Sequence, residues 1–224
     1  MSSVAKKILN ALTGISLVGF LVVHLLGNLT LFSNNPDPFN SYAKFLHDFG
    51  WILTATEIGL LAVFGAHIIS SIVIAVGNRR ARAENYVAGS SGRASATKPA
   101  VSRNMIYTGI LLGAFVVWHV ISFRFGPGVA EGYTTQIQGE TTRDVYRLVY
   151  EFFGNPLNVL LYTGAMILLG FHLRHGYWSA FQSLGAVNKK YMKSVTVTGY
   201  MVAAALSTGF LVIPLWIYFV GSGG

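Results

Sequence analysis

Histidine carries most of the chemistry available to this chain of 224 residues, because the chain has no cysteine and only 11% of its residues are charged. Four of its six histidines stand inside long apolar stretches, namely His24, His67, His119 and His172. An imidazole is costly in hydrocarbon, so each is a candidate for function; the alternative for any single one is a hydrogen-bonded packing residue. Imidazole binds transition metals and transfers protons. The absence of cysteine excludes iron–sulfur clusters and thiolate metal sites held by this chain.

The apolar stretches that hold these histidines predict membrane-spanning helices. Hydrophobic residues make up 53% of the chain, and the charged share is less than half of the roughly 25% that soluble domains carry. A helix crosses about 30 Å of hydrocarbon with roughly 20 apolar residues. Five stretches reach that length: 8–32, 51–76, 105–123, 157–178 and 195–220. We expect one all-α domain over residues 1–224, an integral membrane bundle of five helices, which excludes an ordinary soluble enzyme.

Lys and Arg are concentrated in alternate connections between the predicted spans. Eleven of the sixteen lie before the first span or in the connections after the second and the fourth, and four lie on the opposite side. Because positively charged loops stay in the cytoplasm, we expect a cytoplasmic N-terminus and a C-terminus outside. Topology therefore explains the net charge of +8, and nucleic acid is not expected as a partner.

Two connections are long enough to have a role of their own. Residues 78–104 are basic and rich in Gly, Ser and Ala, which is typical of a flexible cytoplasmic loop or of a docking platform for a soluble partner. Residues 142–153 place apolar side chains on one helical face and predict a helix lying in the interface on the outer side. Residues 40–49 predict a shorter helix of the same kind. No internal repeat is evident along the chain.

The depths of the four histidines sort them into two pairs. At a rise of 1.5 Å per residue, His24 and His119 lie about 24 and 21 Å from the cytoplasmic ends of their spans, in the outer half. His67 and His172 lie about 24 and 22 Å from the outer ends of theirs, in the inner half. Each pair comes from two helices running in the same direction, and the two levels are about 15 Å apart.

Two stacked pairs of imidazoles inside a helix bundle are suited to two b-type haems, each iron held by two histidines. With both axial positions filled, neither iron would bind oxygen, so electron transfer is the expected role and a membrane quinone the expected partner.

His175 lies three residues from His172; it could be the ligand itself or, with Arg174, a partner for a haem propionate. Small residues of the four spans could make room for the macrocycle or serve close helix packing: Gly14, Gly19, Gly27, Gly59, Gly65, Ala66, Gly109, Gly113, Ala114, Gly164 and Gly170.

The motifs around these histidines form a recognisable set. They are Thr13–Gly14, His24–Leu–Leu–Gly27–Asn28–Leu29, Ser102–Arg103–Asn–Met105, Tyr146–Arg147–Leu148–Val149 before Asn155–Pro156, and the run from His172 to Gly185. Together they resemble the dihaem cytochrome b membrane-anchor subunit of succinate dehydrogenase and fumarate reductase (succinate:quinone oxidoreductase, complex II). The resemblance covers nearly the whole chain, with five helices and one ligand in each of the first four. It implies that His67 and His172 hold the proximal haem b, nearer the soluble subunits, and that His24 and His119 hold the distal haem b.

The resemblance also implies roles for residues near the proximal haem. A ligand histidine followed four residues later by glycine, as Gly176 follows His172, favours His172 over His175 as the ligand. His175 and Arg174 then become candidate contacts for the haem propionates. Asn10 matches a polar position near the same propionates, and it could equally be an ordinary helix-start residue.

The partners implied by the resemblance are an iron–sulfur subunit and a flavoprotein subunit on the cytoplasmic side, which would hold the iron–sulfur clusters and the FAD. Electrons from succinate would pass through them and the two haems to a quinone, here menaquinone. The chain itself would do no dicarboxylate chemistry, and it lacks a dinucleotide-binding fingerprint. Its expected place is the cytoplasmic (inner) membrane of a prokaryotic cell, where it contacts lipid as a multi-pass protein.

One carboxylate stands within a predicted span. Glu57 lies toward the outer end of the second span, where it could accept protons from quinol; the alternative is an interfacial carboxylate that reaches toward water. Some dihaem members of the family carry an acidic residue just before the fourth-span ligand, where this chain has Gly170. A proton path that depends on such an acid is therefore in doubt.

Two other functions fit part of the pattern. One is the dihaem cytochrome b anchor of another quinone-linked oxidoreductase, such as a hydrogenase or a nitrate reductase, although the first-span and fourth-span motifs favour succinate dehydrogenase. The other is a transporter or proton channel with a histidine relay. Transporters often show inverted repeats and broken helices, and neither is evident in this sequence.

Overall fold

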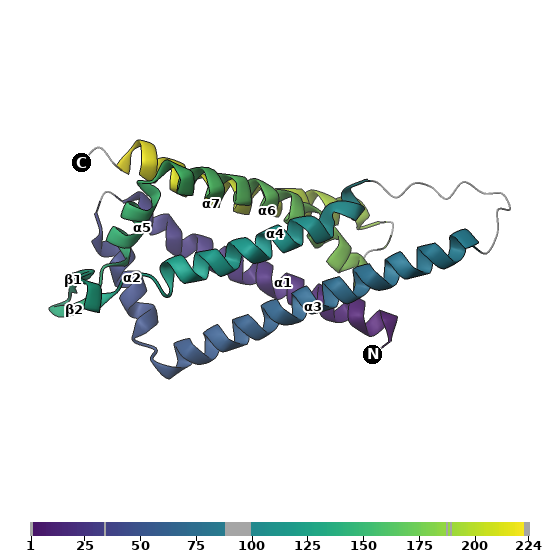
Figure 1. Cartoon of the computed structure of the whole chain (residues 1–224), viewed down its shortest axis with the longest axis horizontal. Helices are drawn as coiled ribbons and strands as arrows, with labels where there is room; N and C mark the ends of the chain where they lie inside the picture. The colour runs from purple at the N-terminus through teal and green to yellow at the C-terminus, as the bar shows by residue number, and fades with distance from the viewer. Residues whose placement is uncertain (1, 34, 88–99, 187, 189, 222–224) are drawn as a thin grey trace.

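Five long helices run along the length of the molecule (Figure 1). The computed structural model describes residues 2–33, 35–87, 100–186, 188 and 190–221. The long helices are α1 (Ser3–Asn28), α3 (Trp51–Val87), α4 (Ala100–Phe123), α6 (Pro156–Ser183) and α7 (Met192–Phe219). Each contains a segment long and apolar enough to cross a membrane. The prediction of an all-α bundle with five spans is confirmed.

Short elements gather at one end of the long helices, which we call the outer end (Figure 1). They are the 3₁₀ turn η1 (Leu29–Phe32), α2 (Asp37–His47), the 3₁₀ turn η2 (Val129–Glu131), the strands β1 (Thr134–Ile137) and β2 (Glu140–Arg143), and α5 (Val145–Phe153). The C-terminus lies at the same end. The start of α1, the end of α3 and the start of α4 lie at the opposite, inner end, as an odd number of spans requires.

Side-chain caps fix where several helices begin. Ser2 accepts a hydrogen bond from the backbone N–H of Ala5 at the start of α1 (3.2 Å). At the start of α6, Asn155 accepts from the N–H of Leu157 (2.9 Å), and Pro156 occupies the first turn. Both arrangements satisfy donors that a helix leaves unpaired at its N-terminus.

The predicted interfacial helix over 142–153 is wrong at its start, because β2 takes residues up to Arg143 and α5 begins at Val145. Asp144 caps α5 by accepting from the N–H of Arg147 (3.0 Å). β1 and β2 form an antiparallel hairpin that the sequence reasoning missed. Its turn places Gln138 and Gly139 at φ values of 55° and 83°, as tight hairpin turns require. The second predicted short helix is present as α2, which begins three residues earlier than expected.

The predicted connection over 78–104 is shorter than expected. The backbone of α3 stays helical to Val87, and α4 begins at Ala100. Ala, Arg and Glu at residues 79–84 favour helix, which explains the extension beyond the apolar stretch. Residues 88–99 lie outside the described residues, so the choice between a flexible loop and a docking platform stays a prediction.

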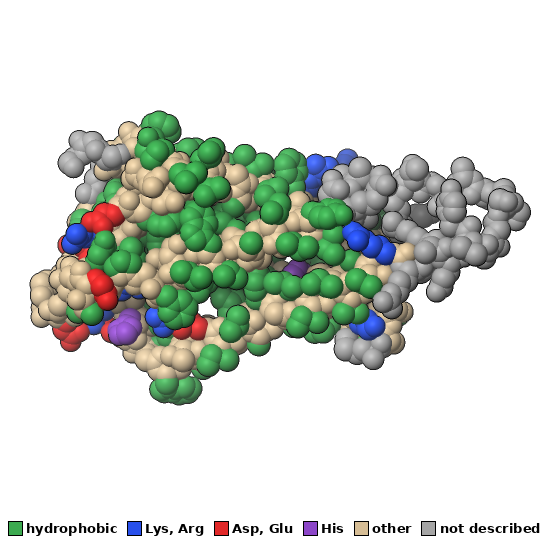
Figure 2. Space-filling view, viewed as in Figure 1, with side chains coloured by type: hydrophobic (Ala, Val, Ile, Leu, Met, Phe, Trp, Pro, Cys, Tyr) green, Lys and Arg blue, Asp and Glu red, His purple; other side chains and the backbone are tan. Residues whose placement is uncertain are grey.

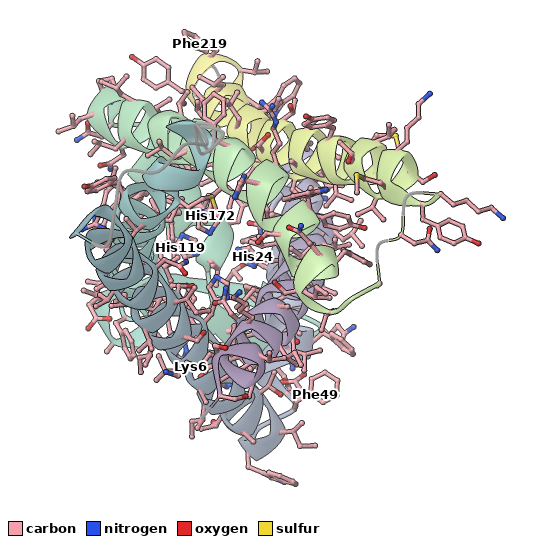
Figure 3. All side chains as sticks on the ribbon, turned by 90° about the vertical axis from the view of Figure 1, so that its right-hand side faces the viewer. Lys6, His24, Phe49, His119, His172 and Phe219 are labelled. Carbon is pink, nitrogen blue, oxygen red and sulfur yellow. The ribbon has the colours of Figure 1, made fainter. Side chains whose placement is uncertain are left out.

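α1, α3, α4 and α6 form a ring, and α7 packs outside it against α6 and α1 (Figure 3). α3 and α4 contact each other only sparsely. The largest apolar core lies at the outer end, where α2, α5, α6 and α7 meet: Leu31, Phe39, Val149, Phe153, Val159, Tyr162, Ile213 and Ile217. Figure 2 shows an apolar belt around the long helices, with Lys and Arg at both ends and Asp and Glu at the outer end. Histidine atoms are visible in an opening in this belt.

Candidate functional site

His24 and His119 form a pair inside the ring of helices. Their ring centroids are 5.8 Å apart, and the rings stand at 89° to each other. They come from α1 and α4, which lie across the ring from one another (Figure 3). Phe20 stacks on His24 at 5.3 Å, and Phe210 of α7 lies 5.7 Å from it. The half-buried outer pair therefore lies among aromatic rings.

The two histidines of the outer pair differ in their polar contacts. His119 Nδ1 lies 3.2 Å from the hydroxyl of Tyr162 on α6, and Tyr162 is buried among Phe115, Trp118 and other aromatic rings. His24 has ring contacts but no side-chain hydrogen bond among the described residues. Both rings keep Nε2 available for another partner.

His67 of α3 and His172 of α6 form the inner pair. His67 Nδ1 lies 3.3 Å from Thr13 Oγ1 on α1, and His172 Nδ1 lies 3.2 Å from Thr108 Oγ1 on α4. α3 and α6 are the second pair of helices that face each other across the ring.

A glycine adjoins each inner histidine. A Cβ atom added to Gly14 would lie 3.2 Å from His67 Cε1, and one added to Gly109 would lie 3.4 Å from His172 Cε1. Each inner imidazole thus contacts two consecutive residues of the preceding long helix, which we call the Thr–Gly step: Thr13–Gly14 for His67 and Thr108–Gly109 for His172. Thr13 contacts the inner pair and lies 11 residues before His24 in α1, so the two levels are separated by about 16 Å along the helix. This agrees with the separation expected from the sequence.

The four helices of the ring form two halves in which the spacing of the site residues is the same. His24 follows Thr13 by 11 residues in α1, and His119 follows Thr108 by 11 residues in α4. In the second helix of each half a histidine follows a glycine by eight residues: Gly59 and His67 in α3, Gly164 and His172 in α6. A short outer helix joins the two long helices of each half, α2 in the first and α5 in the second. Each level therefore takes one histidine from each half.

Other small residues of the spans have packing roles. A Cβ at Gly27 would overlap the ring of Tyr42 on α2, and one at Gly170 would lie 2.9 Å from Ser207 Oγ on α7. Gly113 lies against Ile68 of α3. These three glycines bring helices close together, whereas Gly14 and Gly109 adjoin the candidate ligands.

The two histidine pairs fit a metal cofactor in which the organic part of the cofactor itself supplies most of the ligands to the metal. Among the described residues, His, Cys, Asp and Glu form no group of three or more that could hold a bare metal ion. Each level offers two imidazoles, at least three of the four with Nδ1 in contact with a hydroxyl. Metal-binding histidines are usually held in this way by a hydrogen bond at the second ring nitrogen. Two imidazoles per level are suited to the two axial positions of a haem iron.

Of the three residues expected near the propionates, Asn10 and Arg174 contact other side chains. His175 lies three residues after His172 in the same helix. Asn10 Oδ1 accepts hydrogen bonds from Ser70 (3.0 Å) and Ser71 (2.7 Å), which ties α1 to α3 one turn below the inner pair. The guanidinium of Arg174 lies 4.8 Å from the ring of Tyr200 on α7, so the structure does not bring Arg174 to His172. His175 is half-buried on α6.

Glu57 lies at the outer end in an ion pair. Its two oxygens accept from Arg124 Nε (2.7 Å) and Nη2 (3.2 Å). Both side chains are partly exposed. Glu57, the candidate proton acceptor, thus forms an ion pair with Arg124, the first residue after α4.

Comparison of the chain with protein-family models, with curated proteins and with solved structures finds no match in any of the three. The functional argument therefore depends on the two histidine pairs.

Proposed function

We propose that this chain is the dihaem cytochrome b membrane-anchor subunit of a succinate:quinone oxidoreductase. In this function it carries electrons between an iron–sulfur subunit and a membrane quinone, with menaquinone as the expected quinone. The observation that supports it best is the arrangement of two imidazole pairs, about 16 Å apart along the helices, drawn from opposite helices of one ring.

His67 and His172 would hold the proximal haem, and His24 and His119 the distal one. Bound haem b supplies a reversible one-electron iron couple. Phe20, Phe210 and the aromatic rings around His119 pack against the outer pair, and the hydroxyls of Thr13 and Thr108 orient the inner rings. With both axial sites filled by imidazole, the irons would transfer electrons rather than bind oxygen.

The charges at the inner end support docking of soluble subunits there. The described Lys and Arg side chains at this end are Lys6, Lys7, Arg79, Lys190 and Lys193. A basic face steers an acidic partner surface, and the positive-inside rule places this end in the cytoplasm. The FAD and the iron–sulfur clusters would belong to the flavoprotein and iron–sulfur subunits, in keeping with the absence of cysteine here.

A reduced-minus-oxidised spectrum of the purified full chain tests this function. We expect b-type bands and about two haems per polypeptide, as two bis-histidine sites require. Replacing His24, His67, His119 or His172 by Leu, one at a time, should remove one haem. His47→Leu is the matched control, since His47 is exposed on α2. A purified chain without haem would falsify the proposal.

Copurification separates the proposed complex from other quinone-linked oxidoreductases. Affinity purification from the native membrane should bring an iron–sulfur subunit and a flavoprotein that together oxidise succinate or reduce fumarate. A hydrogenase or nitrate reductase in the same fraction would move the chain to another complex while keeping its haems.

The repeated halves bear on the transporter alternative. Repeats related by an axis along the membrane normal occur in carriers, so the repeat removes one argument against that function. However, the four ring helices are continuous through both histidine levels, and about 16 Å of helix separates the levels. Direct proton transfer cannot cross that distance, whereas electron transfer between cofactors filling the space can.

A further inference from the structure

The hydroxyl of Thr13 has a fixed direction of hydrogen bonding. Thr13 Oγ1 donates to the carbonyl of Leu9 (2.8 Å), with the carbonyl of Asn10 also in reach (3.1 Å). A threonine hydroxyl has only one hydrogen. Since that hydrogen is committed to the backbone, the contact between Thr13 Oγ1 and His67 Nδ1 requires the ring N–H to donate.

The same arrangement recurs in the second half of the chain. Thr108 Oγ1 donates to the carbonyl of Met105 (3.0 Å) and lies 3.2 Å from His172 Nδ1. With the hydroxyl hydrogen on Met105, this contact too has the ring N–H as its donor. In both halves the next residue is a glycine whose missing side chain leaves room for Cε1 of the ring.

In the described part of the chain, neither histidine of the outer pair makes a hydrogen bond to a threonine followed by a glycine. The hydroxyl of Tyr162 has no partner other than His119 among the described residues, so it can either donate to Nδ1 or accept from it. His24 is held by aromatic rings alone. The Thr–Gly step thus distinguishes the inner level from the outer one.

We propose that Thr13 and Thr108 are positioning residues that hold His67 and His172 in the tautomer with Nδ1 protonated, so that Nε2 presents its lone pair to the iron of the inner haem. This inference rests on the proposed function. A hydrogen bond from Nδ1–H makes Nε2 a stronger electron donor, which favours oxidised iron. The two threonines therefore lower the reduction potential of the inner haem.

The tautomer can be measured without any haem. Solid-state ¹⁵N NMR of the full chain, labelled with ¹⁵N-histidine and reconstituted in haem-free lipid bilayers, should show Nδ1–H at His67 and His172. Spectra of His67→Gln and His172→Gln variants identify the two signals. Thr13→Val should alter the signal of His67 and leave that of His172, and Thr13→Ser should restore it. An Nε2–H tautomer at His67 or His172 in the unaltered chain would overturn the proposal.

A redox titration of the haem-loaded chain is the second measurement. Thr13→Val and Thr108→Val should each raise the potential of the same haem, namely the one retained in a His24→Leu variant, with both haems still bound. Thr13→Ser should keep the original value. Thr56→Val is the control, because the exposed hydroxyl of Thr56 donates only to its own helix at Ile52 (2.9 Å).

The two measurements separate this inference from the proposed function. If the unaltered chain binds no haem, the function fails while the NMR result still stands. If two haems bind and neither Thr→Val variant moves a potential, the positioning role is wrong and the function survives.

Discussion

Asn40 and Asp144 join the two short outer helices through a buried hydrogen bond. Asn40 Nδ2 donates to Asp144 Oδ1 (2.8 Å), and Asn40 Oδ1 accepts from the backbone N–H of Tyr146 (3.0 Å). Asn40 is 0% exposed, and Asp144 also caps α5. One amide therefore links α2 of the first half to the start of α5 of the second.

Replacing Asn40 by Leu should destabilise the outer end. The change removes both hydrogen bonds of the buried amide and leaves the half-buried backbone N–H of Tyr146 without this partner, which costs about 1–3 kcal/mol. Denaturant unfolding in detergent micelles, followed by circular dichroism, measures the loss. Gln182→Leu is the control, since Gln182 is an exposed amide on α6, and equal losses in the two variants would contradict the prediction.

Gly27 should not tolerate alanine. Its added Cβ would overlap the ring of Tyr42, and overpacking of this kind costs about 1–3 kcal/mol. Gly19→Ala is the control, because no atom lies within 4 Å of its added Cβ, and alanine is favoured over glycine in a helix by about 1 kcal/mol. In a Tyr42→Ala background the cost of Gly27→Ala should fall sharply. A cost that is unchanged in that background would show that Tyr42 is not the obstacle.

The ion pair between Glu57 and Arg124 should contribute little to stability. Both side chains are partly exposed, and such pairs contribute about 0–1 kcal/mol. Glu57→Gln and Arg124→Gln should each change the free energy of unfolding by less than that amount. A role for Glu57 as proton acceptor adds a second expectation, that Glu57→Gln slows quinol turnover in the intact complex. Unchanged turnover would leave the ion pair as the only role of this carboxylate.

Glu151 should make the hairpin sensitive to acid. Hydrogen bonds from Tyr133 and Arg147 lower the pKa of Glu151 below its usual value. A carboxyl whose pKa is lowered on folding stabilises the fold above its unfolded pKa of about 4.3, and this contribution is lost as the pH falls through the lower folded value. Hydrogen exchange of the β1, β2 and α5 amides should therefore quicken below about pH 4, relative to the intrinsic exchange rate. Glu151→Gln should remove this pH dependence, and a dependence that persists in that variant would assign it to another group.

The five spans could be predicted because their signal is local. Twenty apolar residues in a row form a helix in hydrocarbon whatever lies beside them, so four of the five predicted spans agree with the helices to within about five residues at either end. The exception is α3, which continues to Val87, eleven residues beyond the predicted end of its span. The levels of the histidines followed from the same helices, since depth along a helix depends only on residue count. This is why the pairing of His24 with His119 agrees with the structure.

The hydroxyl partners of the inner histidines could not be predicted in this way. The contact between Thr13 and His67 joins residues 54 apart, and it depends on the rotation of α1 and α3 about their own axes. The hairpin was missed because its strands have only four residues each, although the Gln138–Gly139 turn was a usable signal. The equal spacing from Thr13 to His24 and from Thr108 to His119 was also present in the sequence and could have revealed the two halves.

The repeat has a consequence for the order of assembly. Each level draws one imidazole from α1 or α3 and one from α4 or α6, so the first half of the chain to leave the ribosome offers only one histidine per level. The distal pair is complete once α4 is inserted, and the proximal pair only after α6. In the proposed function, haem binding during biosynthesis would thus require that the second half has entered the membrane and packed against the first, and the proximal site would be completed last.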